Sequence, residues 1–346
     1  MIAEVKSLRK VSSEGADAPD MLYQYLSPLR KYLSEGVNTE VAINRPGEVW
    51  TETRRGWQRH DAPEMDFDTC MQLASLIANF NKKSISADKP IMSAGLIYSE
   101  RAQVVIPPAC EDNTVSLTIR KPSTVDKTVE ELEREGAFDS WEPTRDGLAP
   151  FELELLRLKD ERKISAFLDL AVRSRRNILV VGKTGSGKTT LAKSLVRSIP
   201  PEERLITIED THELFLPNHP NRVHLFYTRE DEGGVIITPK QSLASCLRMK
   251  PDRILLAELR GDEAWEFIKS INTGHPGSIS TMHANGAFDA FEQLTALIKD
   301  SRTGAHLDSG YIKQRLFTTL DVILFYDKYK LREIYYDPEF KRKHMA

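Results

Sequence analysis

A glycine-rich stretch in the middle of the chain, GKTGSGKTT at residues 182–190, has the residue types and spacing to hold a chain of phosphates. It follows the apolar run NILVVG and leads into a helical pattern, the context in which G-x-x-x-x-G-K-[ST] forms a phosphate-binding loop, or P-loop. Glycines let backbone N–H groups point inward, and the N-terminus of the next helix adds positive potential. We expect Lys188 to reach the outer phosphates and the Thr189 hydroxyl to bind Mg²⁺. The residues predicted to bind nucleotide are Gly182, Lys183, Thr184, Gly185, Ser186, Gly187, Lys188, Thr189 and Thr190.

Two further apolar runs end in acids that can serve phosphate chemistry. RLITIED ends with Glu209 and Asp210, and RILLAE ends with Glu258. The carboxyl ends of parallel strands converge on one crevice, so these acids are expected near the phosphates. GHPGSISTMHA brings His275 and His283 around another strand, and both are expected near the same crevice. A P-loop alone leaves kinase, switch GTPase, helicase, packaging motor and transport ATPase open.

Strands that alternate with helices surround these residues. NILVVG, RLITIED, RVHLFY, RILLAE and GSISTMH are short apolar runs, and helical patterns such as GDEAWEFIKSIN follow several of them. This rhythm indicates an α/β domain whose largely parallel sheet is covered by helices on both faces. In TPKQSLASCLRM a helix start is predicted, because Thr238 can cap, Pro239 suits the first turn and Gln241 completes a capping box.

The first third of the chain has the pattern of a smaller α+β module. It combines helical spacing at 21–33 and 67–80 with the strand-like segments TEVAIN, GEVWTET, RAQVVIP and TVSLTIRK. A charge-rich stretch with several glycines and prolines follows, and it is predicted to be a linker carrying one or two short helices. The expected organisation is an N-terminal α+β domain at 1–135, a linker at 136–164 and a P-loop domain at 165–346.

The composition of the chain indicates where the protein is located and which partners it can bind. Cys70, Cys110 and Cys246 are far apart in the sequence, which favours reduced, buried thiols and a cytoplasmic location. No apolar run approaches the roughly 20 residues that cross a bilayer, and residues 1–20, expected to be a flexible lead-in, lack the apolar core of a secretory signal. A net charge of −3 gives no support for direct nucleic-acid binding.

The order of the motifs carries a family resemblance. The P-loop, TIED, LRMKPDRILLAELRG and TGHPGSISTMHA, in this order, resemble the motifs of secretion-superfamily traffic ATPases, and within them the hexameric ATPases of bacterial type IV secretion systems. INRPGEVW, PPACEDNTVSLTIRKPS and ELFLPNHPNRVHLFY extend the resemblance over nearly the whole chain. It implies a RecA-like P-loop domain, ATP and Mg²⁺ as cofactors, and a homo-hexamer that works with inner-membrane secretion-system components at the cytoplasmic face of that membrane.

The same resemblance implies roles for individual residues. Glu258 ends the Walker B strand and Glu209 belongs to an acidic motif; with Thr189 they are expected to manage Mg²⁺ and the attacking water, Glu209 being nearest to the water. His283 is expected to sense the γ-phosphate. Arg101 and Arg120 match positions from which arginines of the N-terminal domain reach the phosphates across the domain interface.

Alternatives remain at this point. A pilus-retraction or type II secretion ATPase is the second candidate, although type II members often carry a four-cysteine zinc module that three scattered cysteines cannot form. A nucleic-acid motor would be expected to show basic loops with stacking aromatic residues, and the sequence has no such cluster. The sequence leaves open whether DNA or protein is transported.

Overall fold

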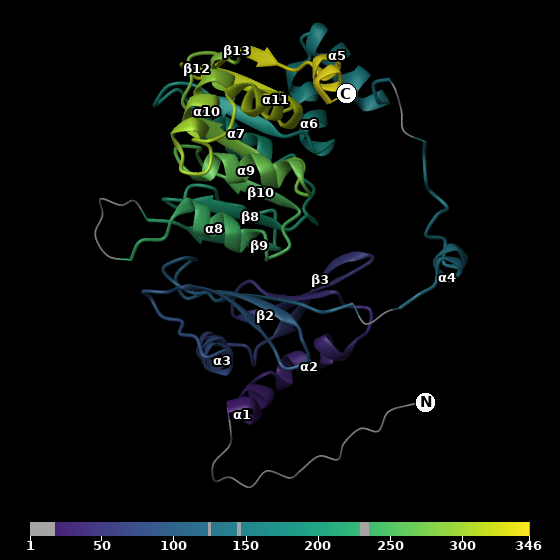
Figure 1. The fold of residues 1–346 in the computed structure, drawn as a ribbon, viewed down its shortest axis with the longest axis vertical. Helices are drawn as coiled ribbons and strands as arrows, with labels where there is room; N and C mark the ends of the chain where they lie inside the picture. Colours follow the sequence, from purple (N-terminus) through teal and green to yellow (C-terminus); the bar gives the residue numbers. More distant parts are fainter. Residues whose placement is uncertain (1–17, 124–125, 144–146, 229–234, 346) are drawn as a thin grey trace.

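The structure is a computed structural model that describes residues 18–123, 126–143, 147–228 and 235–345. Two domains lie one above the other, the N-terminal domain below and the P-loop domain above (Figure 1). Most of the predicted lead-in, residues 1–17, is outside the described residues. The predicted fold class is confirmed: a small α+β domain precedes an α/β P-loop domain.

An antiparallel sheet forms the N-terminal domain, in the strand order β3-β2-β1-β6-β5-β4. Its elements are α1 (Ala18–Tyr25), α2 (Ser27–Ser34), β1 (Glu40–Ile43), β2 (Gly47–Thr53), β3 (Gly56–Ala62), α3 (Phe67–Phe80), β4 (Ile91–Gly95), β5 (Arg101–Val105) and β6 (Ser116–Arg120). The helices cover the face of the sheet that points away from the P-loop domain (Figure 1). There, Leu29, Leu73 and Ile77 share one core with Val49 and Ile119.

Two features of this domain differ from the predicted pattern. The helical stretch at 21–33 is two helices, α1 and α2, because Pro28 in the first turn of α2 has no N–H to donate and cannot continue a helix. β3 and β4 are strands that the sequence pattern does not predict. They are the two edges of the sheet, and the mostly exposed side chains of β3 and the small residues of β4 give no apolar alternation.

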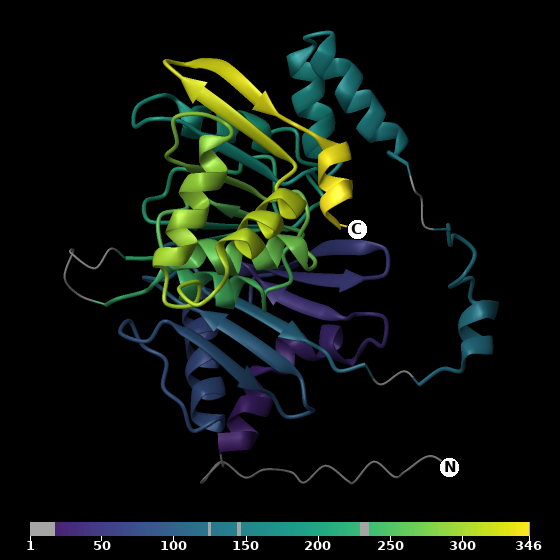
Figure 2. The ribbon, with the colours of Figure 1, turned by 45° about the horizontal axis from the view of Figure 1, so that its top comes forward.

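Two helices lie between the domains in the sequence, one just before the predicted linker and one inside it, and their surroundings differ. α4 (Val129–Arg134) has no buried residue and lies beside the two domains in both ribbon views (Figures 1 and 2). α5 (Pro150–Asp160) instead packs on the P-loop domain, where Leu155 and Leu158 share a core with Phe167 of α6 (Ile164–Arg173). This packing places the start of the P-loop domain near residue 150, ahead of the expected boundary.

A seven-stranded sheet forms the centre of the P-loop domain, in the order β13-β12-β7-β11-β10-β8-β9. The remaining elements are β7 (Ile178–Val181), α7 (Lys188–Val196), β8 (Leu205–Glu209), β9 (Arg222–Phe226), α8 (Pro239–Cys246), β10 (Arg253–Leu256), α9 (Glu263–Asn272), β11 (Ile279–Met282), α10 (Asp289–Asp300), α11 (Ser309–Thr319), β12 (Val322–Asp327), β13 (Lys330–Tyr335) and α12 (Pro338–Met345). Neighbouring strands pair in parallel except β12 with β13. Helices α5, α6 and α7 pack on one face and α8 to α11 on the other, which confirms the predicted layers.

The start of α8 is specified locally, as predicted. The backbone N–H of Gln241 donates to Thr238 Oγ1 at 3.1 Å, and the backbone N–H of Thr238 donates to Gln241 Oε1 at 2.9 Å. This reciprocal pair satisfies two backbone donors that a helix N-terminus would otherwise leave free. Among the described residues, no helix combines the length and the apolarity needed to cross a membrane.

Arg204, directly before β8, joins the two domains. Its side chain is fully buried. In the N-terminal domain the guanidinium donates to Asn44 Oδ1 at 2.7 Å and to Thr118 Oγ1 at 3.3 Å. In the P-loop domain it donates to the carbonyl of Met249 at 2.9 Å and to Asn221 Oδ1 at 2.5 Å. Fixed neutral acceptors therefore compensate the burial of this charge, and they come from both domains.

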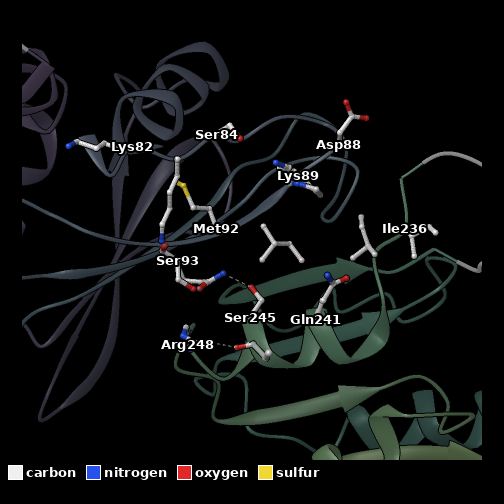
Figure 3. Close-up of a pocket in the computed structure, with 16 residues that line it drawn as sticks. Lys82, Ser84, Asp88, Lys89, Met92, Ser93, Ile236, Gln241, Ser245 and Arg248 are labelled. Atoms are coloured by element: carbon white, nitrogen blue, oxygen red, sulfur yellow. Dashed lines mark hydrogen bonds between the residues drawn. The ribbon is translucent and has the colours of Figure 1, made fainter. Parts of the chain in front are cut away.

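An open pocket of about 820 Å³ lies farther along the same interface (Figure 3). Met92 and Ser93 of β4 line it from the N-terminal domain, and Ser245 of α8 and Arg248, which follows α8, line it from the P-loop domain. Gln103 donates to Ser245 Oγ across the interface at 2.8 Å. The contact between the domains thus includes specific hydrogen bonds, alongside an apolar part in which Val105 and Cys110 share a core with Leu225 and Leu243.

Candidate active site

The P-loop connects the carboxyl end of β7 to the first turn of α7, which points a helix N-terminus at the loop. Gly185 and Gly187 have φ values of 71° and 95°, a backbone region that strains residues with a side chain. Gly182 is limited by space, because a Cβ there would lie 2.1 Å from the carbonyl oxygen of Tyr326. The three glycines are therefore required by the shape of the loop and by its neighbour.

Lys188 opens α7 and folds over the loop. Its Nζ donates to the carbonyl of Lys183 at 2.9 Å and lies 3.4 Å from His283 Nδ1. Burial lowers the pKa of this ammonium, while the charge of Glu258 acts in the opposite direction. The ammonium is thus held at the mouth of the loop, where a P-loop lysine meets the outer phosphates.

Glu258, His283 and Arg260 form a charged cluster opposite Lys188. Glu258 follows β10 and His283 follows β11; these strands are parallel neighbours, so both side chains emerge at the carboxyl edge of the sheet. His283 Nε2 lies 2.7 Å from Glu258 Oε1. Arg260 pairs with Glu258 Oε2 and lies 3.8 Å from Asp210 Oδ2, and the hydrogen bond that it donates to Glu258 raises its pKa.

One pocket of about 270 Å³ contains these groups. Its polar lining residues are Thr184, Lys188, Thr189, Asp210, Thr211, Glu213, Glu258, Arg260, Ser280, Thr281 and His283. Of the other predicted loop residues, Gly185 also lines it, Ser186 Oγ is buried without a hydrogen-bond partner among the described residues, and Thr190 is exposed. The structure therefore brings the P-loop together with Glu258 and His283, as the sequence predicts.

Glu209 is placed differently from the prediction. It is fully buried and does not line the pocket. Its Oε2 accepts the backbone N–H groups of Glu213 and Leu214, both at 2.8 Å, and its Oε1 accepts the Thr207 hydroxyl at 2.6 Å. Burial pushes the pKa of Glu209 upward, but the hydrogen bonds from His224, Thr207 and the two backbone groups outweigh it and leave the pKa low.

This geometry does not fit the predicted role of Glu209 as the acid nearest the attacking water. Both of its oxygens are already held by protein donors. The neighbouring Asp210 and the unpredicted Glu213 line the pocket instead. The sequence could not separate Glu209 from Asp210, because they are adjacent at the end of the same strand and only the direction of each side chain decides which one faces the pocket.

Arg101 and Arg120 are not brought to the P-loop of their own chain. They are opposite each other in the β5–β6 pair, and both are exposed. Arg120 lies 3.4 Å from Glu40 Oε1 and shares a separate pocket with Lys250, which precedes β10. It therefore lies toward the amino ends of the parallel strands, whereas the P-loop lies at their carboxyl ends.

The expectation for His275 is wrong. This residue precedes β11, and its Nδ1 lies 3.0 Å from the carbonyl of Pro251, ahead of β10. Both positions are at the amino edge of the sheet, so only His283 reaches the crevice. Gly277, two residues later, has a positive φ of 84°. A Cβ there would lie 2.7 Å from NH1 of the buried Arg253, so this glycine makes room for that arginine.

The turn of the β12–β13 hairpin contacts the P-loop, and no sequence pattern predicts this contact. The backbone N–H of Tyr329 donates to the carbonyl of Ser186 at 3.0 Å, and the Tyr329 ring leaves 2.7 Å for a Cβ on Gly187. Nothing near residue 329 resembles a nucleotide motif, so only the fold reveals that this turn supports the loop.

A parallel sheet with a P-loop, a strand-end glutamate and a histidine at its carboxyl edge defines a P-loop nucleoside triphosphatase. Comparison with known proteins narrows this class. The family model described as "Type II/IV secretion system protein" matches residues 147–324. Over 327 residues the chain is 44% identical to the type IV secretion system protein VirB11 of Brucella suis, covering 92% of this chain and 91% of the relative.

Further comparisons agree. The chain is 42% identical over 355 residues to VirB11 of Bartonella quintana, covering 98% of both chains. The crystal structure of the Brucella suis VirB11 ATPase in complex with sulphate superimposes with a TM-score of 0.87, at 44% identity, over 93% of this chain and 99% of that one. The chain therefore belongs to the type II/IV secretion system protein family and, within it, to the VirB11 ATPases of type IV secretion systems. These matches favour that function over a pilus-retraction or type II ATPase.

Proposed function

We propose that the chain works as a Mg²⁺-dependent, homo-hexameric ATPase at the cytoplasmic face of the inner membrane, where partner components of the secretion system hold it. The ring uses hydrolysis to move substrates or to assemble a pilus. The observation that carries this proposal is the single pocket in which Lys188 and Thr189 of the P-loop face Glu258 and His283 from two other strands.

The residues in this pocket fit a nucleotide with Mg²⁺. Hydroxyl and carboxylate oxygens are the ligands that Mg²⁺ prefers, and Thr189, Asp210 and Glu258 supply them around one cavity. Bound there, the ion would neutralise charge between the β- and γ-phosphates. Glu209 offers no comparable ligand atom, since its side chain is fully buried and does not line the pocket.

Each side chain then has a definite task. Lys188 binds the outer phosphate oxygens through its ammonium. Glu258, held between His283 and Arg260, orients the attacking water and accepts its proton. His283 touches both Glu258 and Lys188, so loss of the γ-phosphate changes its hydrogen bonds on both sides. Glu209 acts as a positioning residue, because it fixes the backbone beside the pocket at Glu213.

In the ring, Arg101 and Arg120 serve the pocket of a neighbouring subunit. Both side chains are exposed and lie away from the P-loop of their own chain, so an adjacent copy is the nucleotide site available to them. A guanidinium reaching across a subunit boundary would bind phosphate oxygens bidentately and stabilise charge on the transferred group.

The test is ATP turnover by the purified full-length chain, measured with Mg²⁺ and after chelation with EDTA, with particle mass measured in parallel. We expect turnover only with Mg²⁺ and a particle of six chains. A folded hexamer that hydrolyses no ATP would contradict the enzymatic proposal. Full activity in a monomer would instead contradict the ring and the role of neighbouring arginines.

A further inference from the structure

Three metal-binding side chains meet where the N-terminal domain touches the end of β9. Glu111 comes from the loop between β5 and β6, His212 from the segment after β8, and His224 from β9 itself. One potential ligand atom of each lies within 4.8 Å of those of the other two. None of the three belongs to the P-loop pocket. We propose that Glu111, His212 and His224 bind one Zn²⁺, which ties the N-terminal domain to the segment beside the phosphate pocket.

Main-chain contacts place Glu111 at this position. Cys110 and Leu225 form a β-bridge between the domains, and the backbone N–H of Phe226 donates to the carbonyl of Ala109 at 2.9 Å. Because Glu111 follows Cys110 and His224 precedes Leu225, the bridge sets the two ligands side by side. The same end of the sheet faces the N-terminal domain in Figure 1, where β8 and β9 lie nearest to it.

The hydrogen bonds of His224 leave the correct nitrogen for a metal. Thr207 donates its only hydroxyl proton to the Glu209 carboxylate at 2.6 Å. Its oxygen therefore accepts from His224 Nδ1, which lies 2.8 Å away, so Nδ1 carries the ring proton. The lone pair of the neutral ring is then on Nε2. A ligating histidine whose other nitrogen is held through a carboxylate network is a common feature of zinc sites.

His212 supplies a second, independent indication. Its Nε2 is buried and has no hydrogen-bond partner among the described residues, although its ring lies tilted against that of His224 with centroids 4.4 Å apart. A buried nitrogen without a partner is costly unless something binds it.

The ligand set favours zinc over the other common metals. Two imidazoles and a carboxylate, with a water as fourth ligand, suit tetrahedral Zn²⁺ at about 2.0–2.2 Å from each atom. Such a site needs ligand atoms about 3.3–3.6 Å apart, so side-chain rotations that bring these atoms closer by up to about 1.5 Å would close it. Glu111 and the nearby Glu209 provide negative charge to offset the cation. Mg²⁺ would instead prefer an all-oxygen site.

The experiment uses untagged full-length protein, freed of metal by chelation and kept without Mg²⁺ or nucleotide. Zn²⁺ alone is titrated against a chromophoric chelator, and Co²⁺ is added separately to record the visible bands of a tetrahedral site. We expect one Zn²⁺ per chain. Glu111→Gln and His212→Gln should each weaken binding about 100-fold or more, and Thr207→Val about 10-fold, as loss of an outer partner does. Asp112→Asn, an exposed acid beside Glu111, is the matched control and should leave the affinity unchanged.

His283→Gln separates this site from the nucleotide pocket, where His283 and Glu258 form another potential ligand pair. Zinc binding lost in His283→Gln but kept in Glu111→Gln and His212→Gln would overturn the proposal. So would the absence of stoichiometric binding at micromolar Zn²⁺. Melting temperatures with and without Zn²⁺ test each variant for folding, and only chains with the intact cluster should gain stability from the metal.

Discussion

The domain interface and the phosphate pocket each contain a buried cation, Arg204 and Lys188, but they differ in how completely its hydrogen bonds are satisfied. Arg204 is fully buried, and acceptors from four other residues hold its guanidinium. In the pocket, Lys188 has one loop carbonyl and a histidine nitrogen as neighbours, and Arg260 remains half exposed. Polar groups that are fully paired fix one arrangement of the chain, whereas groups with spare hydrogen-bonding capacity can bind a ligand.

The two regions lie at opposite ends of one strand. β8 begins directly after Arg204 and ends at Glu209, and both side chains are fully buried and held by several hydrogen bonds. The pocket residues begin one position later, at Asp210. Fully buried residues such as Arg204 and Glu209 therefore hold the fold, and pocket residues from Asp210 onward face the nucleotide. Mutations should lower stability in the first group and turnover in the second.

The largest effect is expected for Lys188→Ala. Its ammonium is the buried cation at the mouth of the P-loop, and removing such a contact to transferred phosphate should lower turnover about 1,000-fold, or about 4 kcal/mol. The unfolding midpoint should change little. Steady-state hydrolysis and urea denaturation measure the two quantities. Lys193→Ala, an exposed lysine on the same helix, is the control, and near-normal turnover in Lys188→Ala would refute the assignment of the loop.

Arg204→Met should show the opposite behaviour. It removes the guanidinium donor from Asn44 Oδ1 and the Met249 carbonyl and leaves Asn221 Oδ1 with only the Asn44 amide, so the free energy of unfolding should fall by about 3 kcal/mol. Activity of the chains that remain folded should persist. Urea denaturation followed by tryptophan fluorescence is suitable, because the guanidinium lies 4.9 Å over the Trp57 ring. Arg197→Met, at an exposed arginine, provides the comparison; equal stability of the two variants would show that Arg204 does not hold the interface.

Mutations of the two glutamates at strand ends should also differ in effect, with Glu258 affecting turnover and Glu209 affecting stability. Glu258→Gln should keep nucleotide binding but lose about 100-fold in turnover, because the amide cannot accept the proton of the attacking water. Glu209→Gln should instead lower the free energy of unfolding by about 1–2 kcal/mol, since an amide NH₂ would face groups that already donate. Three measurements distinguish loss of turnover from loss of stability: nucleotide affinity, single-turnover rates and urea denaturation. A stable Glu209→Gln variant with no hydrolysis would restore Glu209 as the acid nearest the water.

Glu40 should make the stability of the fold depend on pH. Burial raises the pKa of this carboxyl from its usual 4.5 to about 7, against the opposing charge of Arg120. The folded chain therefore binds more protons than the unfolded chain between these values, and stability falls as pH rises through this window. Between pH 5 and 8 the loss should be about 2 kcal/mol. Glu40→Gln should remove it, as measured by the difference between the two proteins in urea unfolding; parallel curves for both would contradict the raised pKa.

Much of this arrangement follows from the sequence because the signals are local. The P-loop glycines, the α8 capping box and the apolar parallel strands each specify their own conformation. Parallel strands also bring Glu258 and His283 to one edge once their order in the sheet is set. The edge strands β3 and β4 could not be predicted, since their exposed or small side chains show no alternation.

The sequence gives no measure of side-chain direction or of contacts between domains. It cannot show that Glu209 points into the core while Asp210 faces the pocket, or that a turn at Tyr329 supports the P-loop. The cluster of Glu111, His212 and His224 is equally hidden, because one ligand is about 100 residues from the others and no zinc spacing links them. All three features depend on packing between segments that are far apart in the sequence.

The smallest effect is expected for the arginines of the N-terminal domain. If Arg101 and Arg120 serve a neighbouring pocket, replacing both with Ala should lower turnover of the ring about tenfold, roughly the worth of one charge-assisted contact, without dissociating it. Hydrolysis and particle mass are measured together. Arg55→Ala, an exposed arginine in the same domain, is the control.

Mixed rings test which chain supplies the arginines. A Lys188→Ala chain has intact arginines but an inactive P-loop, and the double-arginine variant has the reverse. When the two are assembled together, an intact P-loop can lie beside intact arginines only if these act between subunits. Turnover per active P-loop should then rise above that of rings made from the double-arginine variant alone. If it does not rise, each chain uses its own arginines, and the N-terminal domain must leave the interface at Arg204 to bring them to the nucleotide, because in the present arrangement they lie toward the opposite edge of the sheet.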